Sequence, residues 1–221
     1  MNKEFIKRFI SSILLIPIVI FFVIKGSYIF NFFILICFAI TSYEWFTMTK
    51  NKPYIFLGFI FIIFSFYTVY YLRNEFYDDY IYFLMILFIC IFTDIGGYVF
   101  GKIFKGPKLT KISPNKTYSG MFGGYFLSII FMSLFFTNLD LLFDNANIEV
   151  TGQELTLNNL ILIIVISTAS QFGDIFVSYF KRLSKIKNTG KIIPGHGGLL
   201  DRIDGMIFAF PTSYLILKIF Y

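Results

Sequence analysis

The chain has few charged residues, little cysteine and a single histidine. Charged residues make up 14% of its 221 residues, and only two cysteines occur. A soluble domain has about a quarter charged residues, so this composition excludes an ordinary water-soluble enzyme and a disordered chain. Cys37 and Cys90 lie inside apolar runs and offer neither a disulfide framework nor zinc-ligand spacing. The hydrophobic content of 57% and the mean hydropathy of +0.75 instead indicate a membrane protein.

Seven apolar runs are candidates to cross a bilayer as helices, for which about 20 residues are needed. The runs are continuous rather than alternating, which argues against a barrel. We therefore expect an all-α polytopic membrane protein with a single integral membrane domain over 1–221. Its N-terminal helices would occupy about 9–72, and the helices and loops of a cytoplasm-facing polar site about 80–221. The expected spans are 9–24, 27–46, 54–72, 80–101, 119–139, 159–180 and 204–220.

Lysine and arginine are concentrated in alternate loops between these runs. With the N-terminus in the cytoplasm, 16 of the 19 basic residues fall on the cytoplasmic side. Basic residues near the ends of spans favour the cytoplasm, so we expect a cytoplasmic N-terminus and a strongly basic cytoplasmic face. For any single lysine, topology and attraction to anionic lipids are alternatives to a binding role. The other side keeps Lys25, Arg73 and Lys218.

Three acidic residues lie inside the expected spans: Glu44, Asp94 and Asp174. A charged side chain at the centre of a membrane helix costs about 2.5–3.5 kcal/mol on insertion scales, so each is a candidate for function. All three fall in the cytoplasmic halves of their helices. The alternative for each is a polar group satisfied by a neighbouring helix. That alternative is strongest for Glu44, which beside Trp45 fits a position at the membrane interface.

Helical spacing places further polar residues on common faces, because residues three, four and seven apart face the same way. One face ends in the basic pair of Lys181 and Arg182. The other carries Asp94 with glycines that allow a helix or a ligand to approach closely, and helix packing alone also explains these glycines. The first face is Gln171, Asp174, Ser178 and Lys181, and the second is Asp94, Gly97, Tyr98 and Gly101.

Two polar loops on the cytoplasmic side, 102–120 and 182–204, add candidates. The second loop ends in Asp201 and Asp204, which are three residues apart and face one point on a helix. Paired carboxylates with basic residues nearby are what a magnesium–triphosphate site needs, because oxygen ligands hold the metal while cations neutralise the phosphates. The first loop contributes Ser113, Lys116 and Thr117.

The single histidine, His196, lies between glycines in the second loop. The glycines allow backbone N–H groups to approach phosphate oxygens, and a structural role and a phosphate or proton role explain the histidine equally well. The run is not a Walker loop or a dinucleotide fingerprint. The chain also lacks a Gly-x-Ser-x-Gly elbow, and its basic residues do not interleave with aromatics as in a nucleic-acid-binding surface.

The run from Ser178 to Asp204 resembles the C-terminal signature of phosphatidate cytidylyltransferases, also called CDP-diacylglycerol synthases. The similarity is long, keeps a fixed spacing and is specific. Glu44 with Trp45 also resembles the family, so the likeness extends over most of the chain from about residue 40. The similar residues before the signature are Asp94, Tyr98, Gly101 and the run 113–117 through Gly120.

This resemblance implies that CTP and phosphatidic acid react to CDP-diacylglycerol and pyrophosphate in phospholipid biosynthesis. It implies Mg²⁺ as cofactor, no protein nucleophile, and a multi-pass protein of a bacterial-type inner membrane with a cytoplasmic active site. The implied partners are the two substrates and the lipid bilayer, without nucleic acid. A second, monovalent cation and a homodimer are open alternatives.

The resemblance also implies roles for individual residues. The implied metal ligands are Asp94, Asp174, Asp201 and Asp204. The implied catalytic residues are Asp174, Lys181, Arg182, His196, Asp201, Arg202 and Asp204. The implied substrate-binding residues are Ser113, Lys116, Thr117, Ser178, Lys187, Gly197 and Gly198.

The chain departs from the family pattern at three positions where an acidic residue is usual: Ser119, Val177 and Asn188. The loss of three carboxylates is expected to weaken metal binding or to alter substrate choice, and a degenerate copy is the alternative. Seven spans are also fewer than is common in the family, so we expect an N-terminal helix of the family to be missing.

Three other functions compete with this interpretation. A CTP-dependent polyisoprenol or lipid kinase would share the logic of the site but differ in acceptor. A CDP-alcohol phosphotransferase needs two pairs of aspartates on adjacent helix turns, and the sequence after Asp94 lacks them. A transporter would show repeat symmetry and carboxylates near the bilayer midplane, neither of which the sequence indicates.

Overall fold

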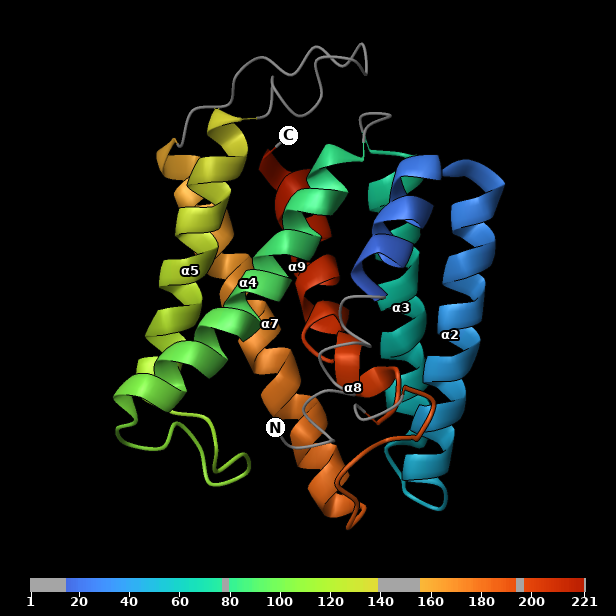
Figure 1. Ribbon diagram of the computed structural model, residues 1–221. Coiled ribbons are helices and arrows are strands. Elements are labelled where there is room, and N and C mark those ends of the chain that lie inside the picture. Colours follow the sequence, from blue (N-terminus) through green and yellow to red (C-terminus); the bar gives the residue numbers. More distant parts are fainter. Residues whose placement is uncertain (1–14, 77–79, 139–155, 194–196, 221) are drawn as a thin grey trace.

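The protein is an assembly of helices whose long axes run between two ends of the molecule (Figure 1). The computed structural model describes residues 15–76, 80–138, 156–193 and 197–220. Within these residues no β-strand is present beyond two isolated bridges. The helices are α2 (Ser27–Thr49), α3 (Ile55–Asn74), α4 (Ile81–Phe104), α5 (Tyr118–Thr137), α7 (Leu157–Leu183), α8 (Leu200–Ile203) and α9 (Met206–Phe220), preceded by the helix Leu15–Lys25.

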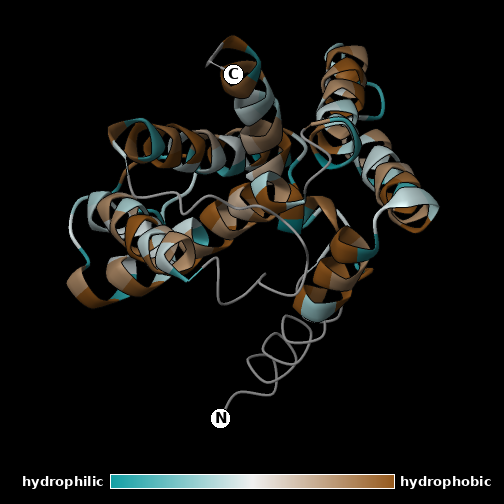
Figure 2. Cartoon of the chain, turned by 90° about the horizontal axis from the view of Figure 1, so that it is seen from above, coloured by the Kyte–Doolittle hydropathy of each residue, from teal (hydrophilic) through white to brown (hydrophobic). Residues whose placement is uncertain are grey.

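Five of these helices, α2, α3, α4, α5 and α7, are long and apolar enough to cross a membrane. The helix Leu15–Lys25 and α9 are shorter and also apolar. Large apolar side chains face outward, such as Leu57, which is 69% exposed, and Phe122, which is 63% exposed. The helices carry mostly hydrophobic residues, and hydrophilic residues lie mainly at helix ends and in the connections (Figure 2). An outward apolar surface of this kind needs lipid around it, so the prediction of an all-α polytopic membrane protein is confirmed.

The helix bounds agree closely with the expected spans, except at the two ends of the chain. Of the first expected span, 9–24, the structure describes only the part from Leu15 onward. The last expected span, 204–220, is interrupted, because a turn at Asp204 and Gly205 separates the short α8 from α9. Asp201 therefore lies within α8, and Asp204 lies in the turn rather than at the start of a long helix.

Pro211 lies inside α9, where it lacks the N–H that would bond the carbonyl of Ile207. That carbonyl accepts a hydrogen bond of 2.7 Å from the Ser65 hydroxyl of α3 instead. The neighbouring helix thus satisfies the backbone group that proline leaves free, as membrane helices require. The contact fixes α9 against α3 directly above the turn that carries Asp204.

The connections 50–54 and 105–117 and the described parts of the connection after α7, 184–193 and 197–199, all lie at the same end of the molecule, the lower end in Figure 1. We call it the polar end. Among the described residues it receives most of the lysines and arginines, while Lys25, Arg73 and Lys218 lie in helices toward the other end. The alternation of basic loops expected from the sequence is therefore present in the fold.

The helices α4 and α5 approach closely through glycine. A Cβ added at Gly96 would lie 2.3 Å from the carbonyl oxygen of Gly123. Gly97, the next residue of α4, has more room, since a Cβ added at Gly97 would lie 3.7 Å from the Gly120 carbonyl oxygen. The closest approach is therefore at Gly96, which does not belong to the face of Gly97 and Gly101 expected from the sequence.

We predict that Gly96→Ala destabilises the protein and that Gly97→Ala does not. The Gly96→Ala methyl group must displace α5, and overpacking of this kind lowers the free energy of unfolding by about 1–3 kcal/mol. The measurement is thermal or denaturant unfolding of both variants in the same detergent. Equal stability of the two variants would contradict this packing.

Candidate active site

The candidate site lies at the polar end, where α7 and the turn between α8 and α9 meet. The connection between α4 and α5 reaches the same place, because α7 packs against α4, α5 and α9. Three separate stretches of chain therefore contribute the polar groups described below.

Lys116 links the first polar loop to α7. Its ammonium group lies 2.5 Å from a carboxylate oxygen of Asp174 and 3.4 Å from the carbonyl oxygen of Gln171. The other Asp174 oxygen accepts a hydrogen bond from Ser178, one helical turn further along α7. Both members of the ion pair stay partly exposed, with side-chain exposures of 24% and 31%. The helical face expected for Asp174 and Ser178 is thus present, and it is accessible to a ligand.

Lys181 links α7 to α8 and to the following turn. Its ammonium group donates to Asp201 at 2.9 Å and lies 3.8 Å from a carboxylate oxygen of Asp204. All three side chains are nearly buried, with exposures between 7% and 11%. One buried cation between two carboxylates fixes both of them relative to α7.

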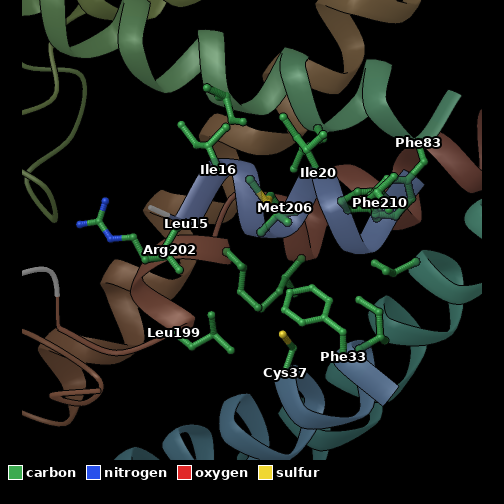
Figure 3. Close-up of a pocket in the computed structure, with 18 of the residues that line it drawn as sticks. Leu15, Ile16, Ile20, Phe33, Cys37, Phe83, Leu199, Arg202, Met206 and Phe210 are labelled. Atoms are coloured by element: carbon green, nitrogen blue, oxygen red, sulfur yellow. The ribbon is translucent and has the colours of Figure 1, made fainter. Parts of the chain in front are cut away.

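Asp94 and Arg202 lie on the lining of a large apolar cavity of about 380 Å³. The other described lining residues are almost all apolar and come from the helix Leu15–Lys25, α2, α3, α4, α8, α9 and the second polar loop, which contributes Ile193 and Leu199. Figure 3 shows the Arg202 guanidinium extending away from the apolar side chains, which include Phe33 and Phe210. The cavity therefore joins a hydrophobic interior to a charged rim.

The carboxylates of Asp94, Asp174 and Asp204 repel one another electrostatically, while Lys116 acts favourably on Asp94 and Asp204. Arg202 also attracts Asp94, and Lys181 attracts Asp204. The site thus alternates acidic and basic groups. Such a surface suits a ligand that carries both phosphates and a cation.

Four aspartates were expected to hold a divalent metal. In the part of the chain that the structure describes, no three His, Cys, Asp or Glu residues converge closely enough to form a complete metal cage. The oxygen-only donor set still fits Mg²⁺, because that ion is usually bound by one or two carboxylates together with substrate phosphates and water. The metal role of these aspartates stays a prediction.

Asp201 is tied into the second polar loop. One of its oxygens accepts hydrogen bonds from the backbone N–H groups of Thr189 at 2.8 Å and Gly198 at 3.0 Å. The other accepts from Lys181. The Gly198 N–H that the sequence suggested for phosphate therefore has a protein carboxylate as its partner, and the substrate roles of Gly197 and Gly198 stay predictions.

Thr117 caps the first turn of α5, since its hydroxyl accepts a hydrogen bond of 3.1 Å from the Gly120 N–H. Ser113 accepts the Lys116 backbone N–H through its carbonyl and is partly buried. These two residues shape the loop that presents Lys116 to Asp174. Their expected role in substrate binding stays a prediction.

Arg182 and Lys187 are exposed at the polar end, where a phosphate group can approach them. Arg182 donates to the Ile186 carbonyl at 3.4 Å. His196 lies outside the described residues, so its expected role stays a prediction.

The three departures from the family pattern have local partners. The Ser119 hydroxyl donates to the Lys105 carbonyl and contacts Thr117. Val177 is buried in an apolar cluster beside Trp45. Asn188 lies against Gly197 in the second loop. A carboxylate at position 177 would be buried among apolar side chains, so valine suits this packing.

Sequence reasoning underrated Glu44. It is 1% exposed, and its carboxylate accepts hydrogen bonds from the second polar loop, including one from the Thr189 hydroxyl. Its neighbour Trp45 is also buried and donates to the Ile55 carbonyl at 3.0 Å. Neither residue occupies the exposed interfacial position suggested for them. The available signal was an acidic residue inside an apolar run, and its partner Thr189 is 145 residues away.

Fold and site together define a polytopic membrane protein with a phosphate-compatible polar site beside an apolar cavity. Residues 52–220 match the sequence model of the Cytidylyltransferase family. The chain is 32% identical to the phosphatidate cytidylyltransferase of Rickettsia felis over 213 residues, which are 95% of this chain and 90% of the relative. It is 39% identical to that of Staphylococcus epidermidis over 137 residues, 62% of this chain and 48% of the relative. The chain belongs to the cytidylyltransferase family and is a nucleotidyltransferase.

We predict that Lys181→Met destabilises the protein far more than Lys185→Met. The first change leaves Asp201 and Asp204 buried without their cation, which costs about 3–5 kcal/mol. Lys185 is exposed, and its replacement should change stability by less than about 0.5 kcal/mol. Denaturant unfolding in mixed micelles measures both. A Lys181→Met variant as stable as the parent would show that the buried ion pairs do not hold this end together.

Proposed function

We propose that the protein transfers the cytidylyl group of CTP to phosphatidic acid, giving CDP-diacylglycerol and pyrophosphate for phospholipid biosynthesis. Membership of the family supports the cytidylyl transfer. The observation that carries the lipid acceptor is the apolar cavity with Asp94 and Arg202 on its lining. An amphiphile whose chains enter the cavity has its phosphate at the charged rim.

The lipid side of the reaction uses the cavity and Arg202. Acyl chains bind among side chains such as Phe33, Phe210 and Met206, which exclude water. The guanidinium of Arg202 is suited to pair with the lipid phosphate, because its fork of donors matches phosphate oxygens. The phosphate is thereby held as nucleophile next to the lysine and carboxylate groups of α7.

The nucleotide side uses the lysines. Lys116, with the exposed Arg182 and Lys187, neutralises the triphosphate and orients its α-phosphorus toward the lipid phosphate. A lipid phosphate oxygen forms a bond to the α-phosphorus, the bond from that phosphorus to the bridging oxygen breaks, and pyrophosphate leaves with the electron pair. Positioning and charge neutralisation supply the rate enhancement, so no protein nucleophile is needed.

Asp174 and Asp204, with Asp94, are the residues that would hold Mg²⁺, since carboxylate oxygens are the ligands that this ion takes from a protein. Bound there, Mg²⁺ would neutralise phosphate charge as a Lewis acid. Lys116 would then move from Asp174 to the phosphates, because the metal replaces it as the partner of that carboxylate.

The polar end is proposed to face the cytoplasm, where CTP is available. The bias of lysine and arginine toward the connections of this end supports the orientation, since such residues near spans favour the cytoplasm. The lipid reaches the cavity from within the bilayer.

The reaction is tested with purified protein in mixed micelles with Mg²⁺, phosphatidic acid and CTP labelled at its α-phosphate. We predict labelled CDP-diacylglycerol from the parent, and a rate lower by about 100-fold or more for Asp174→Asn, which removes one charge from the site. The matched control is Glu75→Gln, because Glu75 is exposed beyond the other end of α3. The control should keep the parent rate.

Two labels separate this function from its main competitor. A CTP-dependent lipid kinase would transfer the γ-phosphate, so lipid labelled from γ-labelled CTP and not from α-labelled CTP would overturn the proposal.

In sealed vesicles, external CTP should yield product only when the vesicles are inside-out. Product in right-side-out vesicles alone would reverse the orientation.

A further inference from the structure

The second polar loop is bound to α2 through a single buried carboxylate, that of Glu44. One Glu44 oxygen accepts the Leu199 N–H at 2.9 Å. The other accepts the Thr189 hydroxyl at 2.9 Å and the Leu200 N–H at 2.8 Å. Three donors from both halves of the loop thus converge on one side chain from a helix far away in the sequence.

The loop is shaped around this carboxylate. A Cβ added at Gly190 would lie 2.6 Å from one Glu44 oxygen, and one added at Gly198 would lie 2.4 Å from the other. Both distances are shorter than a Cβ contact allows, so a side chain at either position would displace the Glu44 carboxylate from its hydrogen bonds. The two glycines therefore allow the loop backbone to enclose Glu44, which explains part of the glycine content that the sequence suggested for phosphate binding.

The carboxylate is held by neutral donors. Among the described residues no lysine, arginine or histidine forms an ion pair with Glu44. Hydrogen bonds from an uncharged hydroxyl and two backbone N–H groups compensate for its burial instead. Such a carboxylate holds a loop in place without drawing a cation away from the site.

Glu44 connects to the site residues through Thr189. The Thr189 hydroxyl donates to Glu44, and its backbone N–H donates to Asp201. Asp201 in turn accepts from Lys181, which also lies near Asp204. A continuous path of hydrogen bonds and ion pairs therefore leads from α2 to the cluster on α7 and the turn before α9.

We propose that Glu44 is a positioning residue for cytidylyl transfer. From α2 it fixes the loop at Thr189, Leu199 and Leu200. As a result α8 presents Asp201 and Arg202, and the turn presents Asp204, to Lys181 and Asp174. Glu44 touches no substrate in this assignment. The inference deepens the proposed function and rests on it for the catalytic part of its test.

The test compares Glu44→Gln with the pair Thr189→Val and Thr189→Ser. The amide of Glu44→Gln keeps the size of the side chain but replaces one acceptor by a donor, which faces the loop donors. Thr189→Val removes the hydroxyl at nearly constant volume, while Thr189→Ser keeps it. The Thr189 pair keeps the test decisive if Glu44→Gln does not fold.

Three readouts are measured for each variant. Amide hydrogen exchange of residues 189–200 reports the loop without any substrate, and we expect about tenfold faster exchange in Glu44→Gln and Thr189→Val, with α5 unchanged. The kcat for CDP-diacylglycerol synthesis should fall by about 100-fold in Glu44→Gln, because a small misplacement of reacting groups has that effect. Thr189→Ser should keep the parent kcat, and melting temperatures should stay within about 3 °C of the parent.

The outcomes separate the inference from the proposed function. Unchanged loop exchange, or loosened loop exchange with an unchanged kcat, would overturn the positioning role. Equal loss of kcat in Thr189→Ser and Thr189→Val would also overturn it, because the hydroxyl would then be irrelevant. A parent without synthase activity would overturn the proposed function, and the exchange data alone would then decide whether Glu44 holds the loop.

Discussion

The polar end of this protein depends on one buried cation. Lys181 lies between Asp201 and Asp204, and it draws the short α8 and the turn before α9 against α7. Two nearly buried carboxylates repel each other unless a cation lies between them. The ion pairs therefore determine where α9 begins and, with it, where Arg202 and the apolar cavity lie relative to Asp174. The geometry of the candidate site is a consequence of this local charge balance.

Close helix packing provides the frame in which that balance operates. The glycine contact between α4 and α5 brings the connection after α4 to α7, where Lys116 meets Asp174. The hydroxyl of Ser65 satisfies the carbonyl that Pro211 leaves free, and so fixes α9 to α3. The Ser65 hydrogen bond satisfies polar backbone in an apolar surrounding, which is the main requirement on helices in lipid. Because packing already holds the helices in place, the site needs only a few polar side chains.

The helices and part of the site could be predicted from the sequence, since both follow from local periodicity. Continuous apolar runs mark the spans, and the spacing of Asp174, Ser178 and Lys181 places them on one helical face. The role of Glu44 could not be predicted, because its hydrogen bonds reach a loop about 145 residues away. Hydrogen-bond partners of a buried carboxylate depend on tertiary packing, which no sequence period encodes. The break between α8 and α9 was missed for the same reason, since Asp204 turns toward Lys181 rather than continuing a helix.

The central claim is that the triphosphate of CTP binds at the polar end between α7 and the first polar loop. The most direct measurement is an experimental structure of the protein in lipid with Mg²⁺ and a CTP analogue whose α–β bridging oxygen is a methylene. The account predicts triphosphate density within contact of Lys116, with Lys116 moved away from Asp174 and Lys181 still between Asp201 and Asp204. Nucleotide density at another end of the bundle, with the Lys116–Asp174 pair intact, would contradict it.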